Sequence, residues 1–301
     1  QNRVSAEASI SGLSPGGFSF DIGPLGLPVK TSSSLGAIWT NGAEPVGQGR
    51  FSLGASYTYL KFAQFNGRSL DRFLDLEEYQ GVPLITPLDI DLDLTTQILG
   101  LSALYGIRDN WEVGLFTPFV FHKSRGQISL KQGGQFVEVG NANGRTEGLG
   151  DMVLLTKYRL AKGQDWSWSV AGRLKLPTGD EEKYLGTGET DVRIQTLLTR
   201  RFGSLESNFD LGYTWNGMGN EFNSINYRTA LSYALSDEIT LVGELIGSHS
   251  EEDIFDTLDA GVGIKLNPSR GLVIQTGLRF PLNDHGLRCD FVPAVGVEWR
   301  F

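Results

Sequence analysis

Charged side chains recur at every second position in several stretches of this chain, opposite apolar side chains. Within residues 153–160, Lys157 and Arg159 have one parity, whereas Leu154, Tyr158 and Leu160 have the other. Successive side chains of an extended strand point to opposite faces, so this alternation predicts strands with one charged and one apolar face.

The charged parity of the predicted strands defines a set of side chains that we expect to line the inside of a barrel. They are Glu112, Asp151, Lys157, Arg159, Arg173, Lys175, Arg193, Glu206, Asp210, Arg228, Glu244, Asp259, Lys265, Arg279 and Glu298. Bases concentrate in 149–202, and acids dominate 204–215, 239–248 and 289–301. Opposed walls of this kind would set a transverse field across a pore and favour small polar or dipolar solutes. The alternative is a narrow barrel whose interior is filled by ion pairs.

A His-x-Ser spacing at His122 and Ser124 matches that of the outer-membrane phospholipase A family. A serine nucleophile needs a base and a group that orients the base. Parity places His122 beside Glu112 on the inner face, whereas a phospholipase acts at the lipid face. His249 and His285 fall in predicted loops with no Ser/Asp partners nearby. We therefore expect no enzymatic activity.

Metal and cofactor sites are poorly supported by the composition. Cys289 is the only cysteine, which excludes an intrachain disulfide and a thiolate metal cluster. Acidic residues in 180–189 and 251–253 offer oxygen ligands for Ca²⁺, or for a Ca²⁺ bridge to lipopolysaccharide. Solvated loop charge is the expected interpretation, so we predict no metal and no cofactor. The net charge of −9 argues against a nucleic-acid partner.

The alternating pattern recurs about twelve times from Arg50 onward, in segments near the ~10 residues of a membrane-spanning strand. The segments are 50–62, 93–107, 111–122, 149–160, 166–176, 190–202, 204–215, 222–235, 239–248, 254–266, 271–281 and 289–301. Tight turns at 108–110, 161–165, 202–204, 236–238 and 267–269 alternate with mostly longer connections at 63–92, 123–148, 177–189, 216–221, 249–253 and 282–288. This predicts an all-β, antiparallel up-and-down transmembrane barrel over 49–301, with short periplasmic turns and longer extracellular loops.

The apolar parity carries Tyr and Trp near the strand ends, as expected for the aromatic girdles of a membrane barrel. A soluble β-sandwich, the alternative, gives aromatic residues no reason to prefer strand ends.

The chain ends with alternating Val297, Trp299 and Phe301, which resembles the signal that the barrel-assembly machinery reads. We therefore expect a location in the Gram-negative outer membrane, in contact with lipid and lipopolysaccharide. Because the chain starts at Gln1 without a basic and apolar leader, we interpret it as a mature product whose signal peptide was removed.

Residues 1–48 are rich in Gly, Ser and Pro and have no sustained period. They also carry apolar side chains, namely Phe18, Phe20, Leu25, Leu27, Leu35, Ile38 and Trp39. This is too apolar for a free tail, so we predict that part of the segment folds into the barrel as a plug or against its periplasmic mouth. The alternative is a periplasmic linker or partner-binding arm.

Three stretches resemble the MetA-like transporter family that is named after phenol-degradation operons. They are QGRFSLGASYTY at 48–59, GLGDM at 148–152, and LKLPTGD at 174–180 followed by GTGETDV at 186–192. The resemblance implies an outer-membrane channel for aromatic or other small organic molecules. We thus predict passive diffusion of a small solute. The other interpretations are a structural barrel that anchors a surface or periplasmic partner and, less favoured, a lipid hydrolase. The sequence favours no particular oligomeric state.

Overall fold

The computed structural model describes residues 20–22, 28–30, 34–72, 74–79, 82–132, 135–250, 256–269 and 271–301. Over this part of the chain, twelve antiparallel strands close into a barrel, because β3 pairs with both β18 and β6. The strands are β3 (Phe51–Phe65), β6 (Val82–Arg108), β7 (Trp111–Gln132), β9 (Val153–Lys162), β10 (Trp166–Lys175), β11 (Asp191–Phe202), β12 (Leu205–Trp215), β13 (Ser224–Ala234), β14 (Ile239–Ser250), β15 (Thr257–Ser269), β16 (Leu272–Pro281) and β18 (Val292–Arg300). The predicted fold class and strand number are confirmed, and closure excludes the two-layer sandwich.

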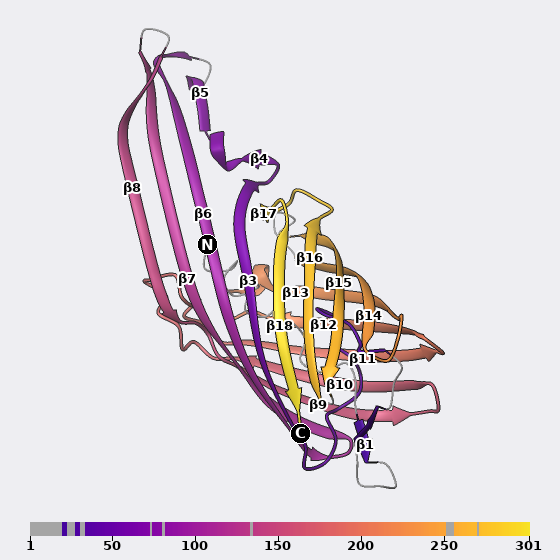
Figure 1. Cartoon of the computed structure of the whole chain (residues 1–301). Helices are drawn as coiled ribbons and strands as arrows, with labels where there is room; N and C mark the ends of the chain where they lie inside the picture. Colours follow the sequence, from indigo (N-terminus) through magenta and orange to yellow (C-terminus); the bar gives the residue numbers. More distant parts are fainter. Residues whose placement is uncertain are drawn as a thin grey trace.

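Two of the predicted long connections, 63–92 and 123–148, are wrong as loops. β6 and β7 continue past the barrel rim and pair there with β5 (Leu74–Tyr79) and β8 (Gln135–Leu149), as Figure 1 shows. The alternation of apolar and acidic residues from Ile90 to Leu94 continues the strand pattern, and Asp93 faces Arg125 across the pair. Cross-strand pairs of opposite charge stabilise such a ribbon, so the hairpin extends as a sheet outside the membrane-spanning wall.

The remaining elements are short. β17 (Leu287–Cys289) and β4 (Arg68–Ser69) pair with β3 at the rim that carries the longer connections. β1 (Phe20–Ile22) pairs with β2 (Pro28–Lys30). Two 3-10 turns, η1 (Leu70–Arg72) and η2 (Asn220–Phe222), lie in connections.

Of the N-terminal segment, 1–19, 23–27 and 31–33 lie outside the described residues, and so do Phe18, Leu25 and Leu27.

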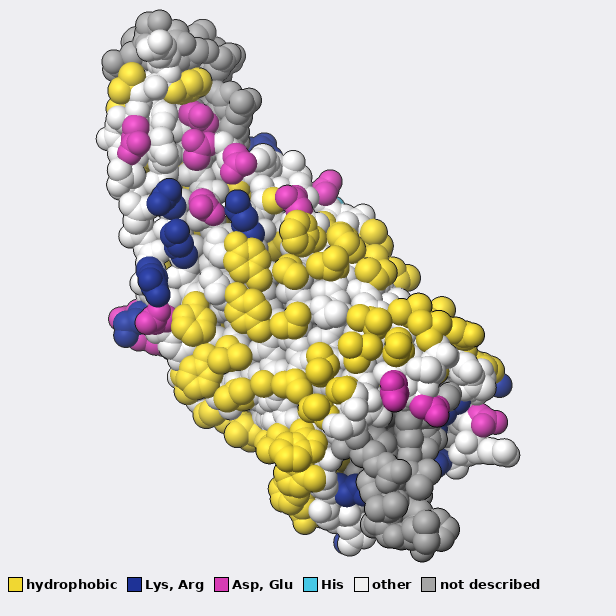
Figure 2. Space-filling model, viewed as in Figure 1, with side chains coloured by type: hydrophobic (Ala, Val, Ile, Leu, Met, Phe, Trp, Pro, Cys, Tyr) yellow, Lys and Arg dark blue, Asp and Glu magenta, His cyan; other side chains and the backbone are white. Residues whose placement is uncertain are grey.

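The outside of the barrel is apolar and its inside is polar. On β13, Leu231 and Tyr233 are 55% and 50% exposed, whereas the alternate residues Arg228 and Ser232 are buried. Figure 2 shows the hydrophobic side chains as a broad band across the visible face of the barrel, with several charged side chains on the extension of β6–β8. This is the reverse of a soluble protein, so the barrel is built to span a lipid bilayer.

Among the described residues, no helix is both long enough and apolar enough to cross a membrane.

Outward-facing tryptophans place their polar group against the neighbouring strand. The indole Nε1 of Trp111 donates to Thr156 Oγ1 (3.0 Å), and that of Trp168 donates to Thr196 Oγ1 (2.8 Å). A buried or lipid-facing indole N–H needs such an acceptor. These bonds allow large aromatic rings on the apolar face without an unsatisfied donor.

Both ends of the barrel sequence meet at the rim that carries the short turns. Phe51 and Phe301 exchange two backbone hydrogen bonds of 2.8 and 3.0 Å, and their rings stack with centroids 5.8 Å apart. Val297, Trp299 and Phe301 all face outward and are exposed. Their function as an assembly signal stays a prediction.

A charge on the outer face should destabilise the barrel. Leu211 lies in the middle of β12 and is 40% exposed on that face. For Leu211→Arg we expect the free energy of unfolding in lipid vesicles to fall by about 2–4 kcal/mol, because the guanidinium would meet hydrocarbon. Denaturant titration followed by tryptophan fluorescence measures this change. Leu211→Val is the control, and equal stability of the two variants would contradict the assignment of this face to lipid.

Candidate functional site in the barrel interior

The charged residues predicted to line the lumen lie on the inner face of the wall. Most are buried, namely Glu112, Asp151, Lys157, Lys175, Arg193, Glu206, Asp210, Arg228, Glu244, Asp259, Lys265 and Glu298. Arg159, Arg173 and Arg279 are half-buried. That these side chains line a conducting path stays a prediction.

Several of these charges are paired along the wall. Lys157 Nζ lies 3.0 Å from Glu112 Oε1 on the neighbouring strand, and Arg201 Nε lies 3.2 Å from Glu206 Oε2. Arg300 Nε lies 2.8 Å from Glu298 Oε1. A buried charge without a partner is costly, so such pairs are expected in a lipid-enclosed interior.

The inner segment, residues 34–46, is buried along its whole length. It begins against the first residues of β14 and β16, near the short-turn rim. There Leu35 N donates to Thr240 Oγ1 (3.0 Å), and the Leu35 side chain packs on Val273. It ends against β7, where Val46 N donates to Glu112 Oε2 (2.7 Å). The segment therefore enters from the short-turn rim, crosses the lumen and returns to the same rim.

One carboxylate, Glu244 on β14, holds the turning point of the inner segment. Its oxygens accept hydrogen bonds from the backbone N–H groups of Ile38 (2.6 Å), Trp39 (3.0 Å) and Thr40 (2.7 Å), and from Thr40 Oγ1 (2.6 Å). Consecutive N–H groups that converge on one anion form the arrangement called a nest. Hydrogen bonds to charged groups contribute about 1.5–3 kcal/mol each, so this residue is a main anchor.

Basic wall residues satisfy the carbonyl groups of the same segment. Lys265 Nζ donates to Ala37 O and Arg228 to Trp39 O, both at 2.8 Å. Lys157 Nζ donates to Glu44 O at 3.3 Å. At these positions acids accept from the N–H groups and bases donate to the C=O groups, which meets part of the hydrogen-bonding demand of a buried, irregular backbone.

The returning limb binds the opposite wall through its own side chains. Asn41 donates to Asp210 Oδ2 (2.6 Å) and accepts from Arg173 (3.0 Å). The Glu44 carboxylate forms ion pairs with two arginines: its Oε2 lies 2.6 Å from Arg159 Nη1, and its Oε1 lies 3.3 Å from Arg201 Nη2. Burial opposes ionisation of Glu44, yet the hydrogen bond from Ser167 and the nearby charges of Arg201, Lys162 and Arg159 hold its pKa below the usual value.

Inward-facing glycines make room for the largest side chain of the inner segment. A Cβ atom on Gly277 would lie 2.5 Å from the Trp39 ring, and one on Gly261 would lie 2.7 Å from it. Any side chain at these positions would displace the ring. Trp39 also packs with Ile38, Val242, Ile246 and Ala294 in one buried cluster.

Two of the three stretches that carry the family resemblance, 148–152 and 174–192, meet around one buried lysine. Lys175 Nζ lies 2.6 Å from Asp191 Oδ2 and 3.7 Å from Asp151 Oδ2, and it contacts Thr187 Oγ1. Asp151 in turn accepts the backbone N–H groups of Gly179 (3.0 Å) and Thr187 (2.9 Å). These two stretches thus fix the 176–190 connection to β9, β10 and β11.

The remaining candidates for catalysis or metal binding are His122 and the acidic residues of the connections. His122 is buried on the inner face, as its parity predicted, and its Nδ1 lies 3.0 Å from Thr96 Oγ1. Within the described residues, no group of three or more His, Cys, Asp or Glu side chains is arranged to hold a metal ion. The acidic run at 251–253 lies outside the described residues.

Sequence reasoning missed Glu44, the small polar wall residues Thr199 and Ser169, and the glycines beneath Trp39. Thr199 Oγ1 accepts from Ala43 N, and Ser169 donates to Ala43 O. The one available signal was that Glu44 is an acid in a segment otherwise rich in Gly, Ser and Pro. Short hydroxyl side chains at alternate strand positions give no comparable signal.

Replacing the Glu244 carboxylate should release the inner segment. In Glu244→Gln, one acceptor oxygen becomes an NH₂ group that faces backbone donors, so the nest loses its anion. We expect amide hydrogen exchange at residues 38–40 to accelerate about 100-fold, which corresponds to about 2.7 kcal/mol. Mass spectrometry of the exchanged protein measures this. Glu147→Gln, at an exposed position of β8, should leave the rate unchanged, and equal rates in both variants would show that Glu244 is not an anchor.

Removing the buried lysine should loosen the 176–190 connection. Lys175→Met leaves Asp151 and Asp191 buried without their cation, and breaking such a pair costs about 3–5 kcal/mol. We expect a lower midpoint of thermal unfolding and faster proteolysis within 176–190. Lys183→Met, which removes an exposed lysine of the same connection, is the control. Similar proteolysis of both variants would refute the anchoring function of Lys175.

Comparison with known proteins agrees with this geometry. The profile of the family described as "Putative MetA-pathway of phenol degradation" matches residues 86–283. No curated protein matches the chain. The crystal structure of the COG4313 outer membrane channel from Pseudomonas putida F1 superposes with a TM-score of 0.59 at 17% identity, covering 86% of this chain and 98% of that one.

A more distant structure is the Ralstonia pickettii toluene transporter TbuX, with a TM-score of 0.47 and 12% identity over 97% of this chain and 99% of that one. The likeness to the COG4313 channel shows a shared fold, and the profile match covers more than half of the chain. The predicted resemblance is confirmed: the chain belongs to the family described as the putative MetA pathway of phenol degradation.

Proposed function

We propose that this protein is a multi-pass barrel of the Gram-negative outer membrane that passes small molecules by diffusion. The observation that carries the proposal is a closed barrel with an apolar exterior and a polar, charged interior. The family description and the fold of an outer-membrane channel support it. The phenol-degradation context of the family favours aromatic or other small organic solutes. We propose transport rather than catalysis as the activity of the barrel.

The inner segment is the plug of this channel. It contacts wall residues from β7 round to β16 and binds them mainly through charged partners such as Glu244, Arg228 and Lys265. Several hydrogen bonds of this kind, at about 1.5–3 kcal/mol each, hold the segment in place. Passage of a solute therefore requires the segment to shift, and the resting channel conducts poorly.

Removing the plug should open the channel. For a variant that lacks residues 1–45, we expect a conductance in planar lipid bilayers several times that of the full chain, because the lumen loses its crossing segment. A variant that lacks only 1–30 keeps the inner segment and should conduct like the full chain. A heat-sensitive shift on gels confirms that each variant has folded as a barrel.

Two outcomes would contradict the proposal in different ways. Equal conductance of the 1–45 deletion and the full chain would rule out the plug. If all folded variants fail to conduct, the channel function itself is wrong, and a barrel that anchors a surface or periplasmic partner becomes the better interpretation.

A further inference from the structure

The outer face of the barrel changes from aromatic to basic near the rim that carries the longer connections. On β7, Phe119 and Phe121 face outward, and the next two residues of the same parity are Lys123 and Arg125. The change takes place over one strand repeat of two residues, which is about 7 Å. Figure 2 shows this boundary, with dark-blue Lys and Arg side chains next to the upper edge of the hydrophobic band.

Strand pairing extends the basic side of this boundary over four neighbouring strands. Lys123 lies opposite Thr95 of β6 and opposite Arg145 of β8, and Thr95 lies opposite Lys61 of β3. We call these four residues the basic row. Partners across antiparallel strands have Cβ atoms about 4.5–5.5 Å apart, so one ligand group can reach neighbouring members of the row.

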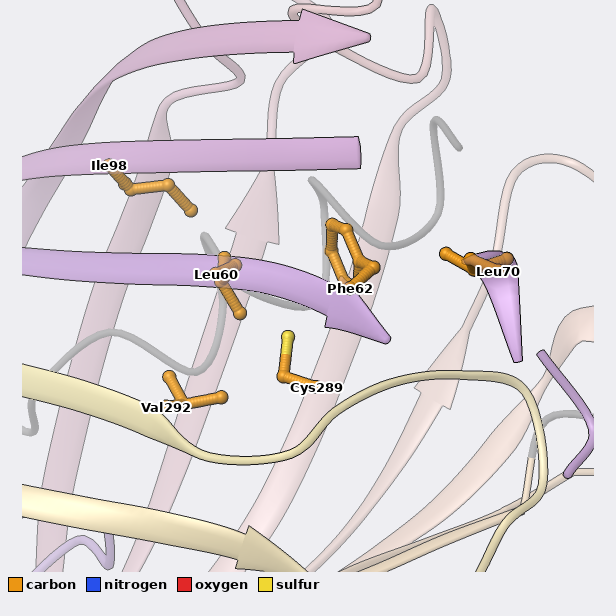
Figure 3. Close-up of a cluster of buried hydrophobic side chains, with 6 residues drawn as sticks. All are labelled: Leu60, Phe62, Leu70, Ile98, Cys289 and Val292. Atoms are coloured by element: carbon orange, nitrogen blue, oxygen red, sulfur yellow. The ribbon is translucent and has the colours of Figure 1, made fainter. Parts of the chain in front are cut away.

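Buried neighbours in the sequence fix the basic row on the outer face of the wall. Leu60 and Phe62, which flank Lys61, belong to the buried cluster that Figure 3 shows. His122, which precedes Lys123, is also buried. Because successive side chains of a strand point to opposite faces, the two lysines between and beside these residues point away from the lumen.

Two like charges lie directly opposite each other at the centre of the row, on Lys123 and Arg145. Such a pair destabilises a sheet. Arg145 Nη2 lies 3.1 Å from Glu147 Oε2, but the two side chains are 78% and 57% exposed, and an ion pair in water contributes little. Lys123 forms no ion pair with another described residue. An anion bound at this point would therefore relieve a repulsion.

Other charges lie at the borders of the row. Asp93 of β6 lies one step farther from the membrane, where it faces Arg125. Asp290, an exposed residue between β17 and β18, borders the end of the row at β3. β5 lies farther out, since it pairs with β6 from Ile90 outward. None of these carboxylates lies opposite Lys123, so the centre of the row is the place where an anion would bind.

The aromatic residues beside the row place it at the level of the lipid headgroups. Tyr59 and Phe121 lie one strand repeat nearer the middle of the barrel wall, each opposite Gln97. Aromatic rings settle where hydrocarbon meets headgroups, and cations just beyond them reach lipid phosphates. The rim with the longer connections is the extracellular one. The lipid of that leaflet is lipopolysaccharide, whose sugar head carries phosphate groups.

We propose that the basic row binds a phosphate group of lipopolysaccharide. The phosphate lies over Lys123, between Arg145 and the Thr95 hydroxyl, and both cations donate charge-assisted hydrogen bonds to its oxygens. The acyl chains of the same lipid lie along Phe119 and Phe121. One lipid then bridges β6, β7 and β8 at the point where they leave the membrane. This site goes beyond the proposed channel function and requires no conduction.

Native mass spectrometry of the full chain in detergent micelles tests the binding. The probe is lipid A, the acylated sugar portion of lipopolysaccharide, with both phosphates present. It should bind at least about tenfold more tightly than lipid A without phosphates and than phosphatidylglycerol, because one charge and one phosphate cannot satisfy the row equally well. Inorganic phosphate at the same concentration should not displace it, because the acyl chains contribute to binding.

Substitutions in the row separate charge from folding. Lys123→Gln and Arg145→Gln should each weaken lipid A binding about fivefold, which is the contribution of one cation near an anionic lipid, and the double variant about 25-fold. Lys123→Arg keeps the charge and should retain the affinity. A heat-sensitive gel shift shows that each variant has folded as a barrel.

Arg200→Gln is the matched control, because Arg200 also lies exposed on the outer face, on β11, but at the opposite rim beside the outward ring of Phe202. It should leave lipid A affinity unchanged. Equal losses in Lys123→Gln and Arg200→Gln would overturn the proposal, and so would equal binding of lipid A without phosphates. Displacement of lipid A by an equal concentration of inorganic phosphate would also overturn it, in favour of a site for free anions.

Discussion

The interior of this barrel depends on the convergence of three consecutive backbone N–H groups on the carboxylate of Glu244. An irregular segment inside a lipid-enclosed barrel has no ladder partner for its polar groups, so the wall must provide one for each. Lys265 and Arg228 do this for the adjacent carbonyls. The wall charges that the strand period assigns to a pore therefore act as hydrogen-bonding partners of a segment that fills it.

The strand wall was predictable because lipid imposes a strict period on side chains. Arg228 and Glu244 were assigned to the inner face from parity alone, and the structure buries both. What each charge binds was not predictable, because this depends on how residues 34–46 are threaded through the lumen. Glu44, bound by Arg159 and Arg201, shows the difference: no periodicity marks a lone acid in an irregular segment.

The extension of β6–β8 and the motif around Lys175 show two further limits of sequence reasoning. Alternation at 90–94 was visible, but a rule that expects ~10-residue spans treats the excess length as loop. Strand parity and the family motifs identified Asp151, Lys175 and Asp191 as charged positions of interest. Only the fold shows that the motifs at 148–152 and 174–192 are neighbours, since strand register brings β9, β10 and β11 together.

The position of the inner segment ahead of all the barrel strands in the sequence also constrains the order of folding. Its binding partners extend from Glu112 on β7 to Val273 on β16, so its binding surface does not exist until most of the wall has formed. Contacts separated by about 200 residues in sequence close slowly, because long loops must be ordered first. The inner segment, which precedes every barrel strand in the sequence, is therefore the last part to dock, and the folding barrel passes through an unfilled state on its way to the native one.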